Sequence, residues 1–258
     1  MPADSVVFVG CVGKDKYAEK LQEANKQAGL HAEYRYDEKE PTGRCGVVIT
    51  GHDRSMCTDL AAANCYKIEH LKENWTLVEN ASVYYVGGYH LTVSVPAVMA
   101  LAEEAAKTNK IFMLSLSAPF IPQIFKDPVD QTAPYWDYVV GNETEAIAYA
   151  DSHDLKTHDI PTIAKHLANL PKENSKRKRT AIITQGTDAT VIAVQGDDEV
   201  KQFPVHEIDK SEICDTNGAG DAFAGGFTAG VVEGKDLATC VGMGSWLAKL
   251  SIKELGPS

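Results

Sequence analysis

Several features that would place a chain in other classes of protein are missing from this sequence. None of the six cysteines belongs to a Cys-x-x-Cys pair, so neither a zinc ribbon nor a dithiol redox site is indicated. No apolar run approaches the roughly 20 residues that span a bilayer, and no basic segment followed by an apolar one opens the chain as in a secretory signal. Positive charge is scarce, because the net charge is −11, which argues against general nucleic-acid binding. We therefore expect an intracellular globular protein with reduced thiols and without a membrane or nucleic-acid partner.

Short apolar runs alternate with helical patterns along all 258 residues. This alternation predicts a mostly parallel sheet covered by helices on both faces. No internal repeat or low-complexity linker divides the chain, so we expect a single α/β domain over 1–258. Strands are expected at 6–9, 31–35, 45–50, 83–86, 111–114, 138–140, 181–184, 190–194 and 200–203, the last two paired across a turn. Helices are expected at 14–28, 60–63, 66–71, 94–107, 146–150, 160–170, 237–254 and over a segment that ends near 232.

One glycine-rich stretch, Asp-Thr-Asn-Gly-Ala-Gly-Asp at 215–221, runs directly into an apolar segment with helical spacing. Glycine lets the backbone come close to a ligand, and the free N–H groups of a helix N-terminus bind phosphate or a developing negative charge. Asp221 stands where that helix begins, so its carboxylate would lie beside the anion site. This combination suits phosphoryl transfer to a hydroxyl. The alternative is a glycine-rich helix start in which Asp221 is only a first-turn charge favoured by the helix dipole.

Polar residues and glycines also follow other predicted strands. Ligands of open parallel sheets bind at the carboxyl ends of the strands, so we expect these stretches to form one site. Asn142 and Glu145, three residues apart, have two interpretations. They form a helix cap, which the local sequence favours, or they steer hydrated Mg²⁺ and phosphate. The stretches concerned are 87–91, 141–145, 184–186 and 214–221.

The loop 10–15, Gly-Cys-Val-Gly-Lys-Asp, has a superficial likeness to a P-loop. Phe8 stands where the first glycine of that motif belongs, and Asp15 replaces its Ser or Thr. We interpret the loop as a tight strand-to-helix turn.

Two further polar segments leave alternatives open. Turns at 41–43 and 51–55 suggest a hairpin in a small lid, where Arg54 is either a solvated turn charge or a group that neutralises a transferring phosphate. The basic run 176–179 is a nuclear import signal, a nucleic-acid patch or a solvated connection, and we favour the connection.

With these stretches in view, the chain resembles the ribokinase-like (PfkB) family of carbohydrate and nucleoside kinases, and within it the eukaryotic adenosine kinases. The motif at 215–221 marks the superfamily, whereas 54–66 and 117–120 point to adenosine rather than a sugar. The resemblance implies a three-layer α/β/α fold with a central, mostly parallel sheet and a small β lid that includes residues 31–58. The matching segments are 10–15, 41–45, 53–55, 60–66, 91–94, 116–120, 141–146, 184–186 and 215–221.

The resemblance also implies transfer of the γ-phosphate of MgATP to the 5′-hydroxyl of adenosine, with Mg²⁺ as cofactor and AMP as a product, as in purine salvage. Asp221 would accept the hydroxyl proton, and Arg54 would close over the phosphate. The other implied roles are an anion hole formed by the N–H groups of Gly218, Ala219 and Gly220, ATP contacts from Asn142, Thr184, Gly186 and Asn217, Mg²⁺ held through water by Asn142 and Glu145, and a nucleoside pocket with Cys45, Met56, Leu60 and Tyr89.

The resemblance is incomplete at the start of the chain. Family members carry a segment before the strand that matches 6–9, with the first strands, part of the lid and a ribose-binding Asp, so we expect a truncated chain with open sheet edges. Two alternatives to an active adenosine kinase follow: a sugar kinase of the same fold, which would need polar pocket residues where apolar ones stand, and an inactive nucleotide-binding remnant. A monomer in the cytoplasm, and also in the nucleus, is the expected state.

Overall fold

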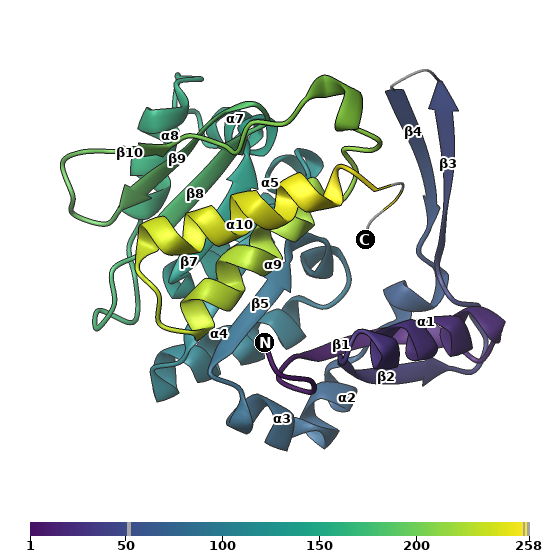
Figure 1. Cartoon of the computed structure of the whole chain (residues 1–258). Coiled ribbons are helices and arrows are strands. Elements are labelled where there is room, and N and C mark those ends of the chain that lie inside the picture. The colour runs from purple at the N-terminus through teal and green to yellow at the C-terminus, as the bar shows by residue number, and fades with distance from the viewer. Residues whose placement is uncertain (51–52, 255, 257–258) are drawn as a thin grey trace. The chain divides into compact units, whose positions relative to one another are not determined.

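Figure 1 shows the computed structural model of the chain, which describes residues 1–50, 53–254 and 256. It consists of two compact units, Met1–Ala81 and Ser82–Ser258, each with its own strands and helices. The expectation of a single domain over 1–258 stays a prediction. Within the described ranges, no helix has both the length and the apolar character needed to cross a bilayer.

The first unit opens with a strand–helix–strand element. Strand β1 (Val7–Gly13) pairs in parallel with β2 (His31–Asp37), and α1 (Lys16–Gln27) connects them. Asp15 caps α1, because its carboxylate accepts two N–H groups of the first turn. The helix stops at Gly29, whose φ of +69° is in the left-handed region that favours glycine. The predicted helix and second strand are confirmed.

Two expectations for β1 are wrong. The strand predicted at 6–9 continues to Gly13, so the residues interpreted as a tight turn are mostly strand. Cys11 and Val12 at the end of the strand are buried, whereas Val7 and Phe8 at its start are exposed. The strand runs on until Gly13 meets the backbone of 40–42, where a Cβ atom would lie 2.6 Å from the Glu40 carbonyl oxygen.

An antiparallel hairpin follows, formed by β3 (Arg44–Thr50) and β4 (Asp53–Asp59). The strand predicted at 45–50 is confirmed. The turn predicted at 51–55 is wrong for its last three residues, which belong to β4, while residues 51–52 lie outside the described part of the chain. Asp, Arg and Ser at 53–55 are frequent in turns, and they conceal the start of the strand. Short helices come next, η1 (Ala61–Cys65), α2 (Ile68–Glu73) and α3 (Trp75–Asn80), of which α3 was not predicted.

The second unit is built on a sheet whose described strands have the order β10-β9-β8-β7-β6-β5. Neighbours from β5 to β8 are parallel, while β9 and β10 continue the sheet with antiparallel pairing. The strands predicted in this region are confirmed, including the pairing of 190–194 with 200–203. The bounds are β5 (Val83–Gly87), β6 (Ile111–Ser115), β7 (Tyr138–Asn142), β8 (Thr180–Gln185), β9 (Asp188–Val194) and β10 (Lys201–Phe203).

Helices cover both faces of this sheet (Figure 1). On one face lie α9 (Ala219–Val232) and α10 (Leu237–Ser251), where Phe227 belongs to one core cluster with Met113 of β6. Leu114 points to the opposite face and is fully buried as well. Helix α4 (Val95–Thr108) packs on β6, and α8 (Ile160–Ala168) packs on β8 and β9. Further helices are α5 (Phe120–Ile124), α6 (Lys126–Thr132) and α7 (Glu143–Ser152), with 3-10 turns η2 (Gly88–Thr92), η3 (Ala133–Tyr135) and η4 (Lys210–Glu212).

Helices α9 and α10 approach each other through glycines. A Cβ atom at Gly226 would lie 2.5 Å from the Met243 carbonyl oxygen, and one at Gly244 would lie 2.8 Å from the Phe223 carbonyl oxygen. Backbone cannot yield at such distances, so these two positions fix how closely the helices pack.

The basic run at 176–179 belongs to the expected connection, in which Lys176 and Lys178 are exposed, but Arg179 contradicts the expectation of a solvated segment. Arg179 is fully buried, and burial lowers the pKa of its guanidinium to about 10. Sequence alone shows a charge run, but the acceptors that hold this charge come from distant segments. The guanidinium donates to the carbonyl oxygens of Ala133, Trp136, Leu167, Leu170 and Pro171, at 2.5, 3.1, 3.3, 2.6 and 2.9 Å.

A second buried charge, like Arg179, lies at the amino ends of the parallel strands. Asp137, which precedes β7, is 1% exposed and pairs with Lys172 at 2.8 Å and Arg177 at 3.1 Å. Its carboxylate also accepts the Phe112 N–H at 3.0 Å. Together with Arg179, these contacts tie the amino ends of β6, β7 and β8 to the segment that leads into β8.

Candidate active site

The glycine-rich stretch forms a tight turn into α9, as predicted. Gly218 has a φ of +81°, which glycine adopts at little cost, and it precedes the first helical residue. The Ala219 N–H makes only a long bond of 3.4 Å, to the Thr216 carbonyl oxygen. The next N–H groups, of Gly220 and Asp221, belong to the first helical turn and have no acceptor within the helix. The helix therefore offers N–H groups to an anion at this end.

Asp215 holds this turn in place. It is buried, and its carboxylate accepts the Asn217 N–H at 3.0 Å and the Gly256 N–H at 3.2 Å. The N–H groups of Cys214 and Asp215 donate to the Ile252 carbonyl oxygen, at 2.9 and 3.3 Å. The turn is thus anchored to the end of α10.

Two carboxylates lie within electrostatic reach of each other at this end of the sheet. Asp221 is exposed, yet loss of part of its hydration raises the pKa of its carboxyl. Glu145 is 6% exposed, and burial raises the pKa of its carboxyl, with smaller raising effects from the charges of Glu143 and Asp221. Both groups hold their negative charge at a cost, which a bound cation would relieve.

Asn142 and Glu145 form the helix cap that the local sequence favours. The Asn142 side-chain oxygen accepts the Glu145 N–H at 2.9 Å, and the Glu145 carboxylate accepts the Asn142 N–H at 3.0 Å. The other Glu145 oxygen accepts from Asn142 Nδ2 at 3.0 Å. Glu145 is therefore held rigidly at the carboxyl end of β7.

Thr184 lies beside this cap. It is opposite Asn142 in the register of β7 and β8, and its hydroxyl donates to the Gly141 carbonyl oxygen at 3.4 Å. Gly186 follows with a φ of +56°, and no atom lies within 4 Å of the place where its Cβ would be. The strand ends at 141–145 and 184–186 therefore meet, as the parallel topology predicts.

Among the aromatic residues of this region only Tyr89 was predicted as a site residue, although Phe120 lies in the segment 117–120 that points to adenosine. The Tyr89 and Phe120 ring centroids are 5.9 Å apart. Burial, and then the charges of Glu145 and Asp221, raise the pKa of the Tyr89 hydroxyl. Tyr85 feels the same two carboxylates, and burial raises the pKa of its hydroxyl to about 12. Alternation along β5 carried the signal for Tyr85, since it pairs with Met113 on the α9 face.

The other predicted site residues belong to the first unit. Cys45 lies in β3, Met56 in β4 and Leu60 just before η1, and all three are exposed. The Arg54 backbone lies in β4, but its side chain is outside the described part of the structure. Their contact with a ligand stays a prediction.

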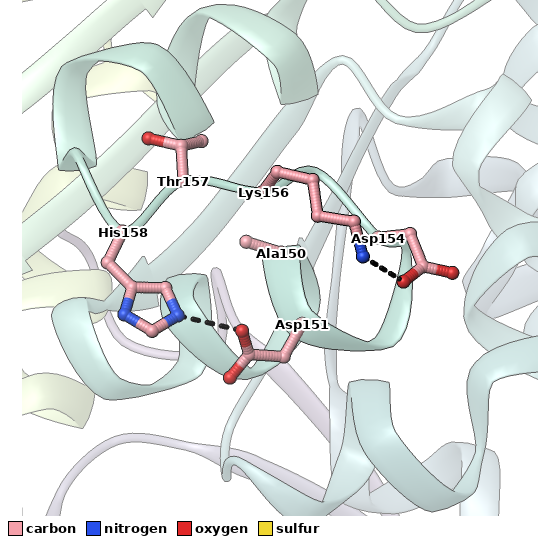
Figure 2. Close-up of a pocket in the computed structure, with 6 residues that line it drawn as sticks. All are labelled: Ala150, Asp151, Asp154, Lys156, Thr157 and His158. Atoms are coloured by element: carbon pink, nitrogen blue, oxygen red, sulfur yellow. Dashed lines mark hydrogen bonds and ion pairs between the residues drawn. The ribbon is translucent and has the colours of Figure 1, made fainter.

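A separate hollow of about 320 Å³ lies at the far end of α7 (Figure 2). Its charged groups pair with one another, His158 with Asp151 at 2.7 Å and Lys156 with Asp154 at 2.9 Å. Because α7 starts at the carboxyl end of β7 and the hollow is lined by residues at the opposite end of this helix, the hollow belongs to a different part of the unit from Asp221.

Comparison with known proteins decides the family. The protein-family model described as pfkB family carbohydrate kinase matches residues 3–258 of the chain. The chain belongs to the pfkB family. An adenosine kinase from Schizosaccharomyces pombe is 46% identical to this pfkB-family chain over 260 residues, covering 99% of the chain and 76% of the relative. Adenosine kinase 1 from Arabidopsis thaliana is 46% identical over 251 residues, covering 96% and 72%.

Solved structures of the family share the fold. An Anopheles gambiae adenosine kinase in complex with P1,P4-di(adenosine-5) tetraphosphate has a TM-score of 0.94 and 44% identity, covering 97% of this chain and 74% of that one. A Schistosoma mansoni adenosine kinase in complex with 2-fluoroadenosine has a TM-score of 0.94 and 34% identity, covering 98% and 74%. The predicted ribokinase-like fold and family membership are confirmed. The expectation of a truncated chain stays a prediction.

Proposed function

We propose that this chain transfers the γ-phosphate of ATP to the 5′-hydroxyl of adenosine and yields AMP and ADP. The observation that carries the proposal is the start of α9, where first-turn N–H groups and the Asp221 carboxylate stand side by side. The identity of 46% with two adenosine kinases over nearly the whole chain supports adenosine, rather than a sugar, as the acceptor.

Asp221 acts as the proton acceptor. Its raised pKa makes the carboxylate a better base than an ordinary aspartate, so it takes the 5′-hydroxyl proton as that oxygen bonds to the γ-phosphorus. The bond from the γ-phosphorus to the oxygen it shares with the β-phosphate breaks, and ADP leaves. Gly218, Ala219 and Gly220 supply the anion hole that stabilises the charge on the transferring group.

Mg²⁺ fits this site as an ion held mainly by phosphates and water. Across the described ranges, no group of three or more His, Cys, Asp or Glu residues could hold a metal. Asn142 and Glu145 are already engaged in the capping box, but a carboxylate keeps further lone pairs for bound water. They would therefore hold the ion through water, and the bound ion would neutralise charge on the β- and γ-phosphates.

The remaining roles follow from the same proposal. Thr184, Gly186 and Asn217 line the ATP side. Tyr89 lies on the nucleoside side, and Cys45, Met56, Leu60 and Arg54 keep the nucleoside and phosphate roles that the resemblance implies. We also propose that the protein acts as a monomer in the cytoplasm and the nucleus.

The test is AMP formation from MgATP and adenosine by the purified chain, beside Asp221→Ala. Loss of the aligned base should lower kcat by a factor of about 10²–10⁴. Glu233→Ala, at the exposed far end of α9, is the matched control and should leave kcat unchanged. Absence of turnover in the unsubstituted, folded chain would reject the proposal, and ATP binding measured by calorimetry would then identify an inactive nucleotide-binding protein.

A further inference from the structure

Strands β5 and β6 separate at their carboxyl ends, beside the candidate active site. Their regular pairing stops at Gly87 and Ser115. Beyond this point β6 still pairs with β7, because the Leu116 N–H donates to the Val140 carbonyl oxygen at 2.8 Å. The first N–H after β5, that of Gly88 in η2, bonds to a side chain in place of a backbone acceptor of β6.

The hydroxyl of Ser117 takes the place of that acceptor. It accepts the Gly88 N–H at 2.8 Å and lies 3.4 Å from the Ser115 carbonyl oxygen. To reach this position Ser117 adopts a φ of +63°, a left-handed conformation that is uncommon outside glycine, Asn and Asp. Non-glycine residues in this region persist only where the surrounding structure holds them, and they concentrate at functional sites.

Only glycine fits at position 88, because the backbone of β6 lies close to it. A Cβ atom there would lie 2.6 Å from the Ser115 carbonyl oxygen and 2.9 Å from that of Leu116. The backbone at Gly88 is therefore clamped between the end of β6 and the Ser117 hydroxyl. We call this contact the Ser117–Gly88 clamp.

The clamp stands directly before both aromatic residues of the site. Tyr89 follows Gly88, and Phe120 follows Ser117 by three residues, so each ring is carried by one side of the clamp. The rings meet at 5.9 Å, and Tyr89 is 51% exposed, so few other contacts fix its position.

We propose that Ser117 is a positioning residue for the nucleoside side of the site: by holding the Gly88 N–H, it fixes the spacing of Tyr89 and Phe120 to accept a planar aromatic base. The inference rests on the proposed function, since that function puts the nucleoside beside Tyr89. The ATP side, at 142, 184 and 218–220, does not include the clamp.

The test compares Ser117→Ala and Ser117→Gly with the unsubstituted chain. Both variants remove the acceptor, but glycine also relieves the left-handed strain, so an effect shared by the two belongs to the hydrogen bond. We expect both to raise the KM for adenosine about 10-fold, with the KM for ATP and kcat changed by less than about 3-fold. Ser152→Ala removes a hydroxyl that donates to the Tyr149 carbonyl oxygen at 2.9 Å, and it should change neither KM.

Amide hydrogen exchange of Gly88 in the ligand-free protein gives a readout that does not depend on activity. The Gly88 amide should exchange about 10-fold or more faster in both variants than in the unsubstituted chain. Equal exchange, an unchanged KM for adenosine, or parallel changes in both KM values would overturn the inference. If the unsubstituted chain fails to phosphorylate or bind adenosine, the proposed function fails first and the inference falls with it, even if the exchange result agrees.

Discussion

Replacing Arg179 by Met should destabilise the second unit severely. The substitution leaves five carbonyl oxygens without the donor that each now has. A hydrogen bond to a charged group contributes about 1.5–3 kcal/mol net, but burying the guanidinium offsets part of this sum. Removing one partner of a buried charged network costs about 3–5 kcal/mol. We expect a loss of this size, which is a large share of the roughly 5–15 kcal/mol that holds a domain together.

Urea unfolding followed by tryptophan fluorescence measures this loss. Trp75 belongs to the first unit, so replacing it with Phe in every protein compared leaves Trp136 and Trp246 to report on the second unit. Lys178→Met is the matched control, because Lys178 is exposed and pairs with Asp197 at 2.7 Å. The control should lose less than about 1 kcal/mol. A loss below about 1 kcal/mol for Arg179→Met as well would refute the structural role of the buried guanidinium.

The remaining predictions concern helix packing and pH. Gly226→Ala should cost about 1–3 kcal/mol, because the new methyl group meets backbone of α10. Gly242→Ala, where nothing lies within 4 Å, should stabilise by about 0.5–1 kcal/mol, and equal melting temperatures for the two variants would contradict the packing account. The acid limb of kcat/KM should have its midpoint above 3.8, since the pKa of Asp221 is raised from that value and the base is lost as pH falls. Because the pKa of Asp221 is raised in the folded state, ionisation of this carboxyl lowers the stability of the protein as pH rises through that pKa. The inactive variant Asp221→Asn should therefore have a melting temperature at pH 7 no lower than that of the unsubstituted chain.

The parallel core of the second unit could be predicted because its strands are short apolar runs. At 111–114 and 181–184 each run is buried on both faces, so apolar character alone marks the strand. Strand β4 could not be found in this way, since both of its faces carry polar residues and it begins with residues common in turns. The short helices α3 and α6 were missed because six or seven residues give too little periodicity.

The parts of the candidate site that could be predicted are those whose geometry depends on neighbouring residues alone. The glycine turn at 218 and the cap at 142–145 are local, so their residues predict their geometry. Ser117 and Phe120 act through contacts with Gly88 and Tyr89 of η2, which depend on the pairing of β5 with β6 and which no local pattern encodes. Arg179 failed as a prediction for the same reason, because the acceptors that make it a core residue lie 8 to 46 positions away in the chain.

The amino ends of the parallel strands hold buried structural contacts, whereas their carboxyl ends hold the candidate site, and this difference affects which substitutions the protein tolerates. The amino ends are locked by Asp137 and Arg179, whereas the carboxyl ends carry glycines and carboxylates whose ionised forms are disfavoured. In a saturation mutagenesis screen scored for both abundance and growth that requires the enzyme's activity, substitutions at the amino ends of the strands should deplete the protein itself. Substitutions at 218–221 should instead leave the protein abundant but catalytically inactive. Positions that protect folding and positions that set the chemistry should therefore separate at opposite ends of the same strands.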